Sequence, residues 1–147
     1  VIDGHQPEKS LDAVDADAMA RQFALAIQAF GPLLARDRRA VLASLSARVG
    51  SIGDNDLGGW IGYRAAKAAQ NQIIRTAAIE ITRKEKQHIV VALHPGTVVT
   101  RLSSTYADRH PTISPNESAK ALLALIARLT PDDSGTFWDW KGKRIAW

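Results

Sequence analysis

The chain has 147 residues, a formal net charge of +4 and 46% hydrophobic residues, the balance of a single globular domain spanning residues 1–147. Cysteine is absent, which excludes disulfide bonds and thiolate metal sites, and the four histidines show no metal-ligand spacing. The sequence has no apolar run long enough to span a bilayer and no secretion signal at its start. We therefore expect a cytoplasmic protein without a membrane partner.

The first part of the chain predicts a strand, a helix, a strand and a loop. Val1–Gly4 is typical of the tail of a strand, and a start without Met indicates a fragment. Apolar residues then recur at helical spacing, which predicts a helix from Asp15 to about Ala35 with an interruption at Gly31–Pro32. The apolar run Ala40–Leu45 predicts a buried strand. Residues 46–62 carry five glycines and predict a loop with unusual backbone angles.

The remainder of the chain alternates helices with strands. A long helical pattern runs from about Trp60 or Gly62 to Glu85, and the β-branched run Ile89–Leu93 predicts a strand covered on both faces. Ser114 begins a capping box, with Pro115 at the first helical position, and predicts a helix that includes Glu117–Leu129. Phe137–Trp140 alternates in polarity and predicts a last strand.

Two basic clusters account for part of the positive charge. They are Arg36, Arg38 and Arg39, and Arg83, Lys84 and Lys86. Both lie where helices are expected to end, and the helix dipole favours cations there. This explanation outweighs a nucleic-acid surface, so we expect no nucleic-acid partner.

Strands that alternate with helices predict an α/β fold, in which a parallel sheet is doubly wound by helices. Ligands of such sheets bind beyond the carboxyl ends of the strands. The loops after Leu45 and Leu93 lie at those ends, and they carry Ser46, Ser51 and the segment Pro95–Thr100. We expect these segments to converge on one site.

Tyr63 and Lys67 lie one turn apart on the same face of the long helix that follows the first of these loops. A nearby ammonium favours the phenolate and is expected to lower the pKa of the tyrosine. A tyrosine tuned in this way can exchange a proton with a carbonyl or alcohol oxygen near neutral pH. The pair is therefore a candidate acid–base device.

The sequence resembles the short-chain dehydrogenase/reductase family in four blocks. They are Leu45–Ile52, Gly59–Ala69, His94–Thr100 and Gly135–Trp140. Within the family it is most similar to the C-factor and sniffer-like carbonyl reductase branch. The resemblance covers nearly the whole chain but only the C-terminal part of the family's domain. It implies a Rossmann-like fold in which the first strands and the glycine-rich phosphate loop are missing.

The resemblance also implies roles for individual residues. Tyr63 would give a proton to the substrate carbonyl, and Lys67 would lower its pKa and hold the ribose of the cofactor. The cofactor would be NAD(P)(H), with the choice between NADP and NAD undetermined and no metal required. The residues Pro95, Gly96, Val98 and Thr100 would complete the cofactor site.

The catalytic serine is ambiguous in this sequence. The family often ends the strand before the loop with two serines, of which the second is the catalyst, and that second position is Ala47 here. Ser51 is weighted slightly above Ser46 as the replacement, although either hydroxyl could simply bond the loop backbone. The helix Asn that the family places before Gly–Pro is also absent ahead of Gly31–Pro32.

These features predict an NAD(P)-dependent oxidoreductase of the carbonyl reductase or alcohol dehydrogenase type. Its partners would be a small carbonyl or alcohol substrate and further copies of the chain in a homo-dimer or homo-tetramer. The alternative is a non-catalytic interaction or signalling protein on the same scaffold. Because the phosphate loop is missing, we expect residues 1–147 alone to be inactive.

Overall fold

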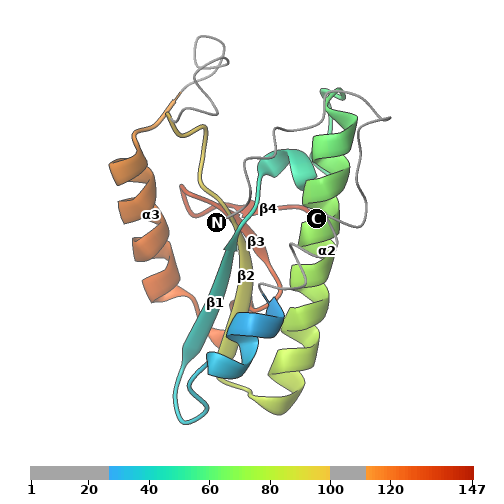
Figure 1. The fold of residues 1–147 in the computed structure, drawn as a ribbon. Helices are drawn as coiled ribbons and strands as arrows, with labels where there is room; N and C mark the ends of the chain where they lie inside the picture. Colours follow the sequence, from blue (N-terminus) through green and yellow to red (C-terminus); the bar gives the residue numbers. More distant parts are fainter. Residues whose placement is uncertain (1–26, 100–111) are drawn as a thin grey trace.

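The computed structural model describes residues 27–99 and 112–147. In these ranges a four-stranded sheet has the order β1-β2-β3-β4 (Figure 1). The strands are β1 (Ala40–Leu45), β2 (His88–His94), β3 (Phe137–Asp139) and β4 (Arg144–Ile145). β1, β2 and β3 run parallel, and β4 returns antiparallel to β3. The expected parallel sheet is confirmed, and the short antiparallel edge strand β4 was not predicted.

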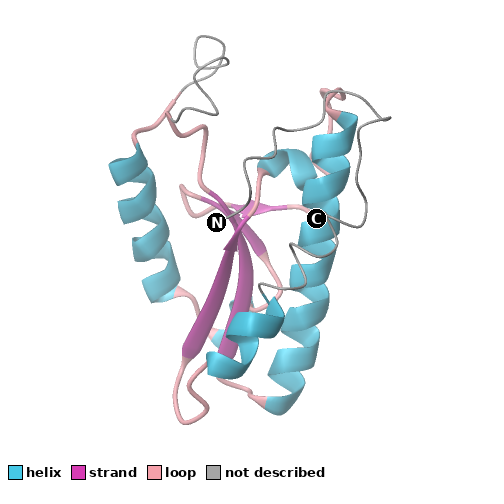
Figure 2. Cartoon of the chain, in the orientation of Figure 1, coloured by secondary structure: helices cyan, strands magenta, loops and turns pink. Residues whose placement is uncertain are grey.

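Helices cover both faces of the sheet. α2 (Ile61–Lys84) and α3 (Pro115–Arg128) lie on opposite sides of the strands (Figure 2). Alternate residues of β2 supply the two cores, because neighbouring strand residues point to opposite faces. The α2 core contains Ile74, Ala78, Val90, Ala92, Phe137 and Ile145. The α3 core contains Ile89, Val91, Leu93, Leu122, Leu125 and Leu129. The doubly wound α/β fold is thus confirmed.

Burial differs between the two long strands. Residues 88–93 of β2 are all buried, as expected for a strand with neighbours on both edges and helices on both faces. The prediction of a buried strand at Ala40–Leu45 has the right bounds but the wrong burial, because five of its residues are half-buried and Leu45 is exposed. Among the described residues β1 pairs only with β2, so no further strand of the described sheet shields its other edge.

The two helices begin in different ways. α3 begins with the predicted capping box, in which Ser114 accepts a hydrogen bond from the Glu117 amide and the Glu117 carboxylate accepts one from the Ser114 amide. α2 begins after Trp60, which has a φ of 55° and no side-chain cap. Gly58 and Gly59 precede it, also with positive φ. This run of left-handed residues turns the chain sharply into α2, which confirms the unusual backbone angles expected in the loop.

The first expected helix lies largely outside the described residues, as does the strand tail at Val1–Gly4. Residues 27–30 are helical and the α-helix is interrupted at Gly31–Pro32, as predicted, but it does not resume towards Ala35. A short 3₁₀ helix, η2 (Gly31–Leu33), follows instead, and the backbone is extended at Leu34. Pro32 accounts for the change, because its ring removes a backbone donor from the α-helical pattern.

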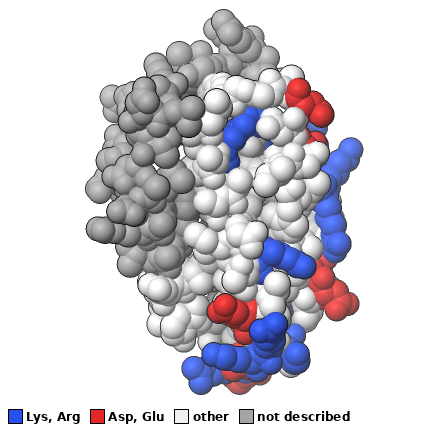
Figure 3. All heavy atoms as spheres, turned by 90° about the vertical axis from the view of Figure 1, so that its right-hand side faces the viewer, with Lys and Arg blue, Asp and Glu red and all other residues white. Residues whose placement is uncertain are grey.

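On the face shown in Figure 3, a group of charged side chains gathers at the end of the molecule where α2 ends, and others lie along one edge. Arg83 and Lys84 occupy the last turn of α2, where the helix dipole favours cations. The positive charge therefore has a local structural explanation in this cluster. No helix in the described ranges is long and apolar enough to cross a membrane.

Two leucines of α3 allow a matched test of the packing against the sheet. Leu125 is 2% exposed and Leu123 is 66% exposed. We expect Leu125→Ala to lower the free energy of unfolding by about 2–5 kcal/mol, because it leaves a cavity in the α3 core. Leu123→Ala should change it by less than about 0.5 kcal/mol. Urea denaturation measures both, and equal effects would contradict this assignment of the faces.

Candidate active site

Tyr63 and Lys67 occupy the first two turns of α2, beside the carboxyl end of β1. The Lys67 Nζ lies 5.9 Å from the centroid of the Tyr63 ring. The Trp60 ring is tilted at 54° to the Tyr63 ring, and the two ring centroids are 6.1 Å apart. The structure therefore brings the phenol and the ammonium together on one helix face, as their spacing predicts.

Burial controls the electrostatics of this pair. It raises the pKa of the Tyr63 phenol above its usual 10.0 and lowers the pKa of the Lys67 amine below its usual 10.5. The expectation that Lys67 lowers the pKa of Tyr63 is wrong for the chain in this state, because desolvation of the phenolate outweighs the attraction of an ammonium that is itself partly buried. Tyr63 is consequently protonated at neutral pH.

A chain of hydrogen bonds joins Lys67 to the end of β1. The ammonium donates to Gln70 Oε1 at 2.9 Å. The Gln70 amide nitrogen donates in turn to Ser44 Oγ and to the Leu45 carbonyl, both at 2.9 Å. Nothing in the local sequence pattern singles out Gln70, since a glutamine on a helix is usually solvated.

Both candidate serines are buried and already bonded. Ser46 donates to Asn71 Oδ1 at 2.6 Å, and Ser51 donates to the Ala146 carbonyl at 2.6 Å. Ser51 also accepts from the Asp54 amide at 3.0 Å. Neither hydroxyl bonds Tyr63 in the part of the chain that the structure describes. Ser51 has the loop-bonding role that was the alternative for both serines, and Ser46 ties the end of β1 to α2.

Gly50 holds residues 46–53, the segment after β1 that carries Ser46 and Ser51 and is called the serine loop below, against α2. It ends the short 3₁₀ helix η3 (Arg48–Gly50), whose backbone meets the helix at Lys67. A Cβ added at Gly50 would lie 2.6 Å from the Lys67 Cβ and 2.7 Å from the Lys67 carbonyl carbon. Only glycine permits so close an approach of two backbones.

The cofactor candidates Pro95, Gly96 and Val98 follow β2 directly. The Pro95 carbonyl accepts a hydrogen bond from Ser118 of α3 at 2.7 Å. Gly96 has a φ of 84°, and a Cβ there would lie 2.7 Å from Trp140 Nε1. Val98 forms a parallel bridge to Ile113. The fourth candidate, Thr100, lies outside the described residues.

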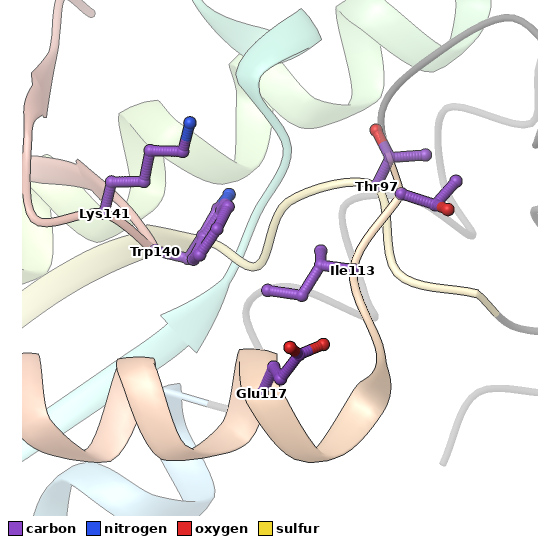
Figure 4. A pocket seen from close by; sticks show the side chains of 6 residues that line it. Thr97, Ile113, Glu117, Trp140 and Lys141 are labelled. Carbon is purple, nitrogen blue, oxygen red and sulfur yellow. The ribbon is translucent and has the colours of Figure 1, made fainter.

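A hollow of about 300 Å³ opens beside this turn (Figure 4). Its walls come from the segment after Gly96, the start of α3 and the turn after β3. The lining residues are Thr97, Thr112, Ile113, Glu117, Trp140 and Lys141. Neither Tyr63 nor Lys67 lines it, so it is separate from the acid–base pair.

The sequence reasoning missed an ionic cluster at the same edge of the sheet. Arg48 pairs with Asp139 at 3.1 Å and with Asp54 at 2.9 Å, which joins the serine loop to the end of β3. His94 lies opposite Asp139 in the sheet register. Its Nδ1 is buried without a hydrogen-bond partner among the described residues. Only the coincidence of charged residues at two strand ends could have indicated this cluster.

Burial and the nearby Arg48 lower the pKa of His94 from its usual 6.5 to about 4, against the opposing pull of Asp139. The imidazole is therefore neutral at pH 7. It forms an uncharged wall beside the Pro95–Gly96 turn.

Comparison with known proteins gives this geometry a context. No family model matches the chain. The C-signal protein of Myxococcus xanthus is 32% identical over 94% of this chain and 84% of its own length. The chain belongs to the short-chain dehydrogenase/reductase family. The predicted family is thereby confirmed.

Two further relatives are longer than this chain. The 1-hydroxy-2-glutathionyl-2-methyl-3-butene dehydrogenase of a Rhodococcus species is 33% identical over 92% of this chain. The NADPH-bound carbonyl reductase from chicken fatty liver is 30% identical and superposes with a TM-score of 0.79 over 97% of this chain. The chain spans 61% of the first protein and 62% of the second.

The neutral state of His94 predicts a pH dependence of stability. Because its pKa is lower in the folded chain, the unfolded chain binds the proton first as the pH falls. The stabilisation is complete above about pH 6.5 and is lost as the pH falls towards 4. Between these limits the free energy of unfolding should fall by about 2–3 kcal/mol more in the parent chain than in the His94→Asn variant. Urea denaturation across this range measures the difference, and parallel curves would contradict it.

The close approach at Gly50 predicts a large effect for one methyl group. Gly50→Ala should lower the free energy of unfolding by about 1–3 kcal/mol, because backbone atoms of α2 cannot move aside. Gly31→Ala is the matched control, since its nearest neighbour would be Ile81 Cδ1 at 4.0 Å. Thermal and urea unfolding measure both variants. A Gly50→Ala chain as stable as the control would show that the loop has freedom to withdraw.

Proposed function

We propose that this chain forms the proton-transfer part of an NAD(P)-dependent carbonyl reductase. The observation that supports it is the phenol of Tyr63 beside the ammonium of Lys67, at the carboxyl end of a parallel sheet. The similarity to an NADPH-bound carbonyl reductase adds the reaction class. The substrate is a small aldehyde or ketone, reduced to the alcohol.

The residues present suit the nicotinamide half of a dinucleotide. The Lys67 ammonium and the Tyr63 phenol are hydrogen-bond donors of the kind that ribose hydroxyls accept. Pro95, Gly96, Val98 and Thr100 are the proposed contacts beyond β2, where Gly96 allows a sharp turn of the backbone. When bound, the dinucleotide supplies the hydride that reduces the carbonyl carbon.

Tyr63 provides the proton in this proposal. Burial keeps the phenol protonated at neutral pH, so its O–H can donate to the carbonyl oxygen as negative charge develops there. The proton passes to that oxygen, which becomes the hydroxyl of the alcohol, and Lys67 stabilises the phenolate that remains. Activity should therefore persist through neutral pH and fall as the pH rises through the pKa of Tyr63.

The second donor to the substrate oxygen is Ser51 or Ser46. Both hydroxyl protons are engaged, with the Ala146 carbonyl and the Asn71 amide oxygen respectively, and either must turn to reach a substrate. Ser46 directly follows β1 at the ligand edge of the sheet, whereas Ser51 anchors the loop to the end of the chain. These contacts favour Ser46 more than the sequence did.

The proposal concerns the full-length protein that contains this chain. The longer relatives supply residues with no counterpart here, so residues 1–147 alone are expected to lack turnover. The homo-oligomeric state and the cytoplasmic location stay predictions.

A reductase assay with a Tyr63→Phe variant tests the proposal. The full-length protein, mixed with NADPH or NADH and a panel of aldehydes and ketones, should oxidise the nucleotide. Tyr63→Phe should lower kcat by about 100-fold to 10,000-fold, because it removes the proton donor and leaves the ring. Cofactor consumption measured by absorbance gives both rates.

Matched serine variants complete the assay. Ser46→Ala and Ser51→Ala are compared for kcat and for the midpoint of urea unfolding, and the serine that donates to substrate is the one whose loss lowers kcat beyond its effect on stability. Absence of turnover on every substrate, together with absence of nucleotide binding by calorimetry, would instead support the non-catalytic alternative.

A further inference from the structure

We propose that Gln70 is a positioning residue that fixes the Lys67 ammonium over the proton-transfer site by anchoring it to the end of β1. This inference rests on the proposed function for its catalytic consequence. The physical tether can be tested without turnover or cofactor.

The orientation of the Gln70 amide follows from its partners. The Leu45 carbonyl can only accept a hydrogen bond, so the amide nitrogen of Gln70 must face β1. The ammonium of Lys67 can only donate, so the amide oxygen of Gln70 must face Lys67. The two obligate partners fix one of the two amide orientations. Ser44 Oγ, at 2.9 Å from the same nitrogen, reinforces it.

Burial makes this arrangement rigid. Gln70 is 7% exposed, and reversal of its amide would place a donor against a donor and an acceptor against an acceptor. The anchor is the backbone at the end of β1, whose neighbouring strand β2 is buried throughout residues 88–93. The position of Lys67 Nζ is therefore fixed relative to the sheet, where the ligand site lies, as well as relative to its own helix.

The same contact opposes the effect of burial on Lys67. Desolvation lowers the pKa of the amine, and an oxygen acceptor that faces the ammonium favours its charged form. A lysine side chain has several free torsions, and one fixed acceptor removes much of that freedom before a ligand binds. Gln70 therefore keeps Lys67 both charged and in place.

The direct test measures the pKa of Lys67 in the 147-residue chain. Trace acetylation with acetic anhydride from about pH 7 to pH 11, followed by peptide mass spectrometry, gives the ionisation of each lysine. Gln70→Leu should lower the Lys67 value by about 1 pH unit, because it removes the acceptor. Gln70→Glu should raise it above that of the parent, because a carboxylate takes the acceptor's place.

Gln72→Leu is the matched control on the same helix. Gln72 is exposed, and its amide donates to Thr76 one turn along. This variant should leave the Lys67 pKa unchanged. Equal Lys67 values in the parent, Gln70→Leu and Gln70→Glu chains would overturn the tether. Should Gln70→Leu fail to fold, Gln70→Met is the second variant, because it is unbranched, also lacks the acceptor and should lower the Lys67 pKa in the same direction.

Kinetics of the full-length protein test the catalytic consequence. Gln70→Leu should raise KM for the dinucleotide about ten-fold through the misplaced ammonium, and Gln70→Glu, which keeps an acceptor for Lys67 but loses the donor to the Leu45 carbonyl, should also raise it. A shifted Lys67 pKa without any reductase activity would leave the tether standing and refute the proposed function. Normal reductase activity with an unshifted Lys67 pKa in both Gln70 variants would refute the tether and leave the proposed function standing.

Discussion

The candidate site depends on one close contact between two backbones. Gly50 of the serine loop lies against α2 at Lys67, where even a methyl group has no room. This contact sets the distance between the loop and the helix that carries Tyr63. The other contacts of the site follow from it, because Ser46 can reach Asn71 and Gln70 can reach Leu45 only when the loop and α2 are this close. Packing density at a glycine thus determines where the polar groups lie.

Burial shapes the chemistry of the site more than charge does. Tyr63, Lys67 and His94 are all shifted in the direction that favours their neutral forms. A site that favours neutral groups is suited to holding a proton on a phenol until a substrate oxygen needs it. At the edge of the same region the Arg48 guanidinium pairs with two carboxylates, Asp54 and Asp139.

The sequence predicted the elements that local patterns specify. The apolar runs placed β1 and β2 to within a residue, and the Ser114 capping box placed α3, because hydrophobic period and capping chemistry are local. β4 escaped prediction since its two residues are defined only by pairing with β3. In the site, the spacing of Tyr63 and Lys67 was sufficient for their juxtaposition. The partners of Ser51, Gln70 and His94 come from other elements, and no local pattern encodes them.

The bond from Ser51 to Ala146 joins residues 95 positions apart, and the Gly53 amide similarly donates to the Trp147 carbonyl. The serine loop is therefore closed by Ala146 and Trp147. Synthesis proceeds from the amino end, so α2 and β2 emerge from the ribosome long before Ala146 and Trp147. The loop must wait for them, and the entropy of closing so long a segment is overcome only after the sheet between them has formed. We therefore expect order at this site to be a late event in the folding of the chain.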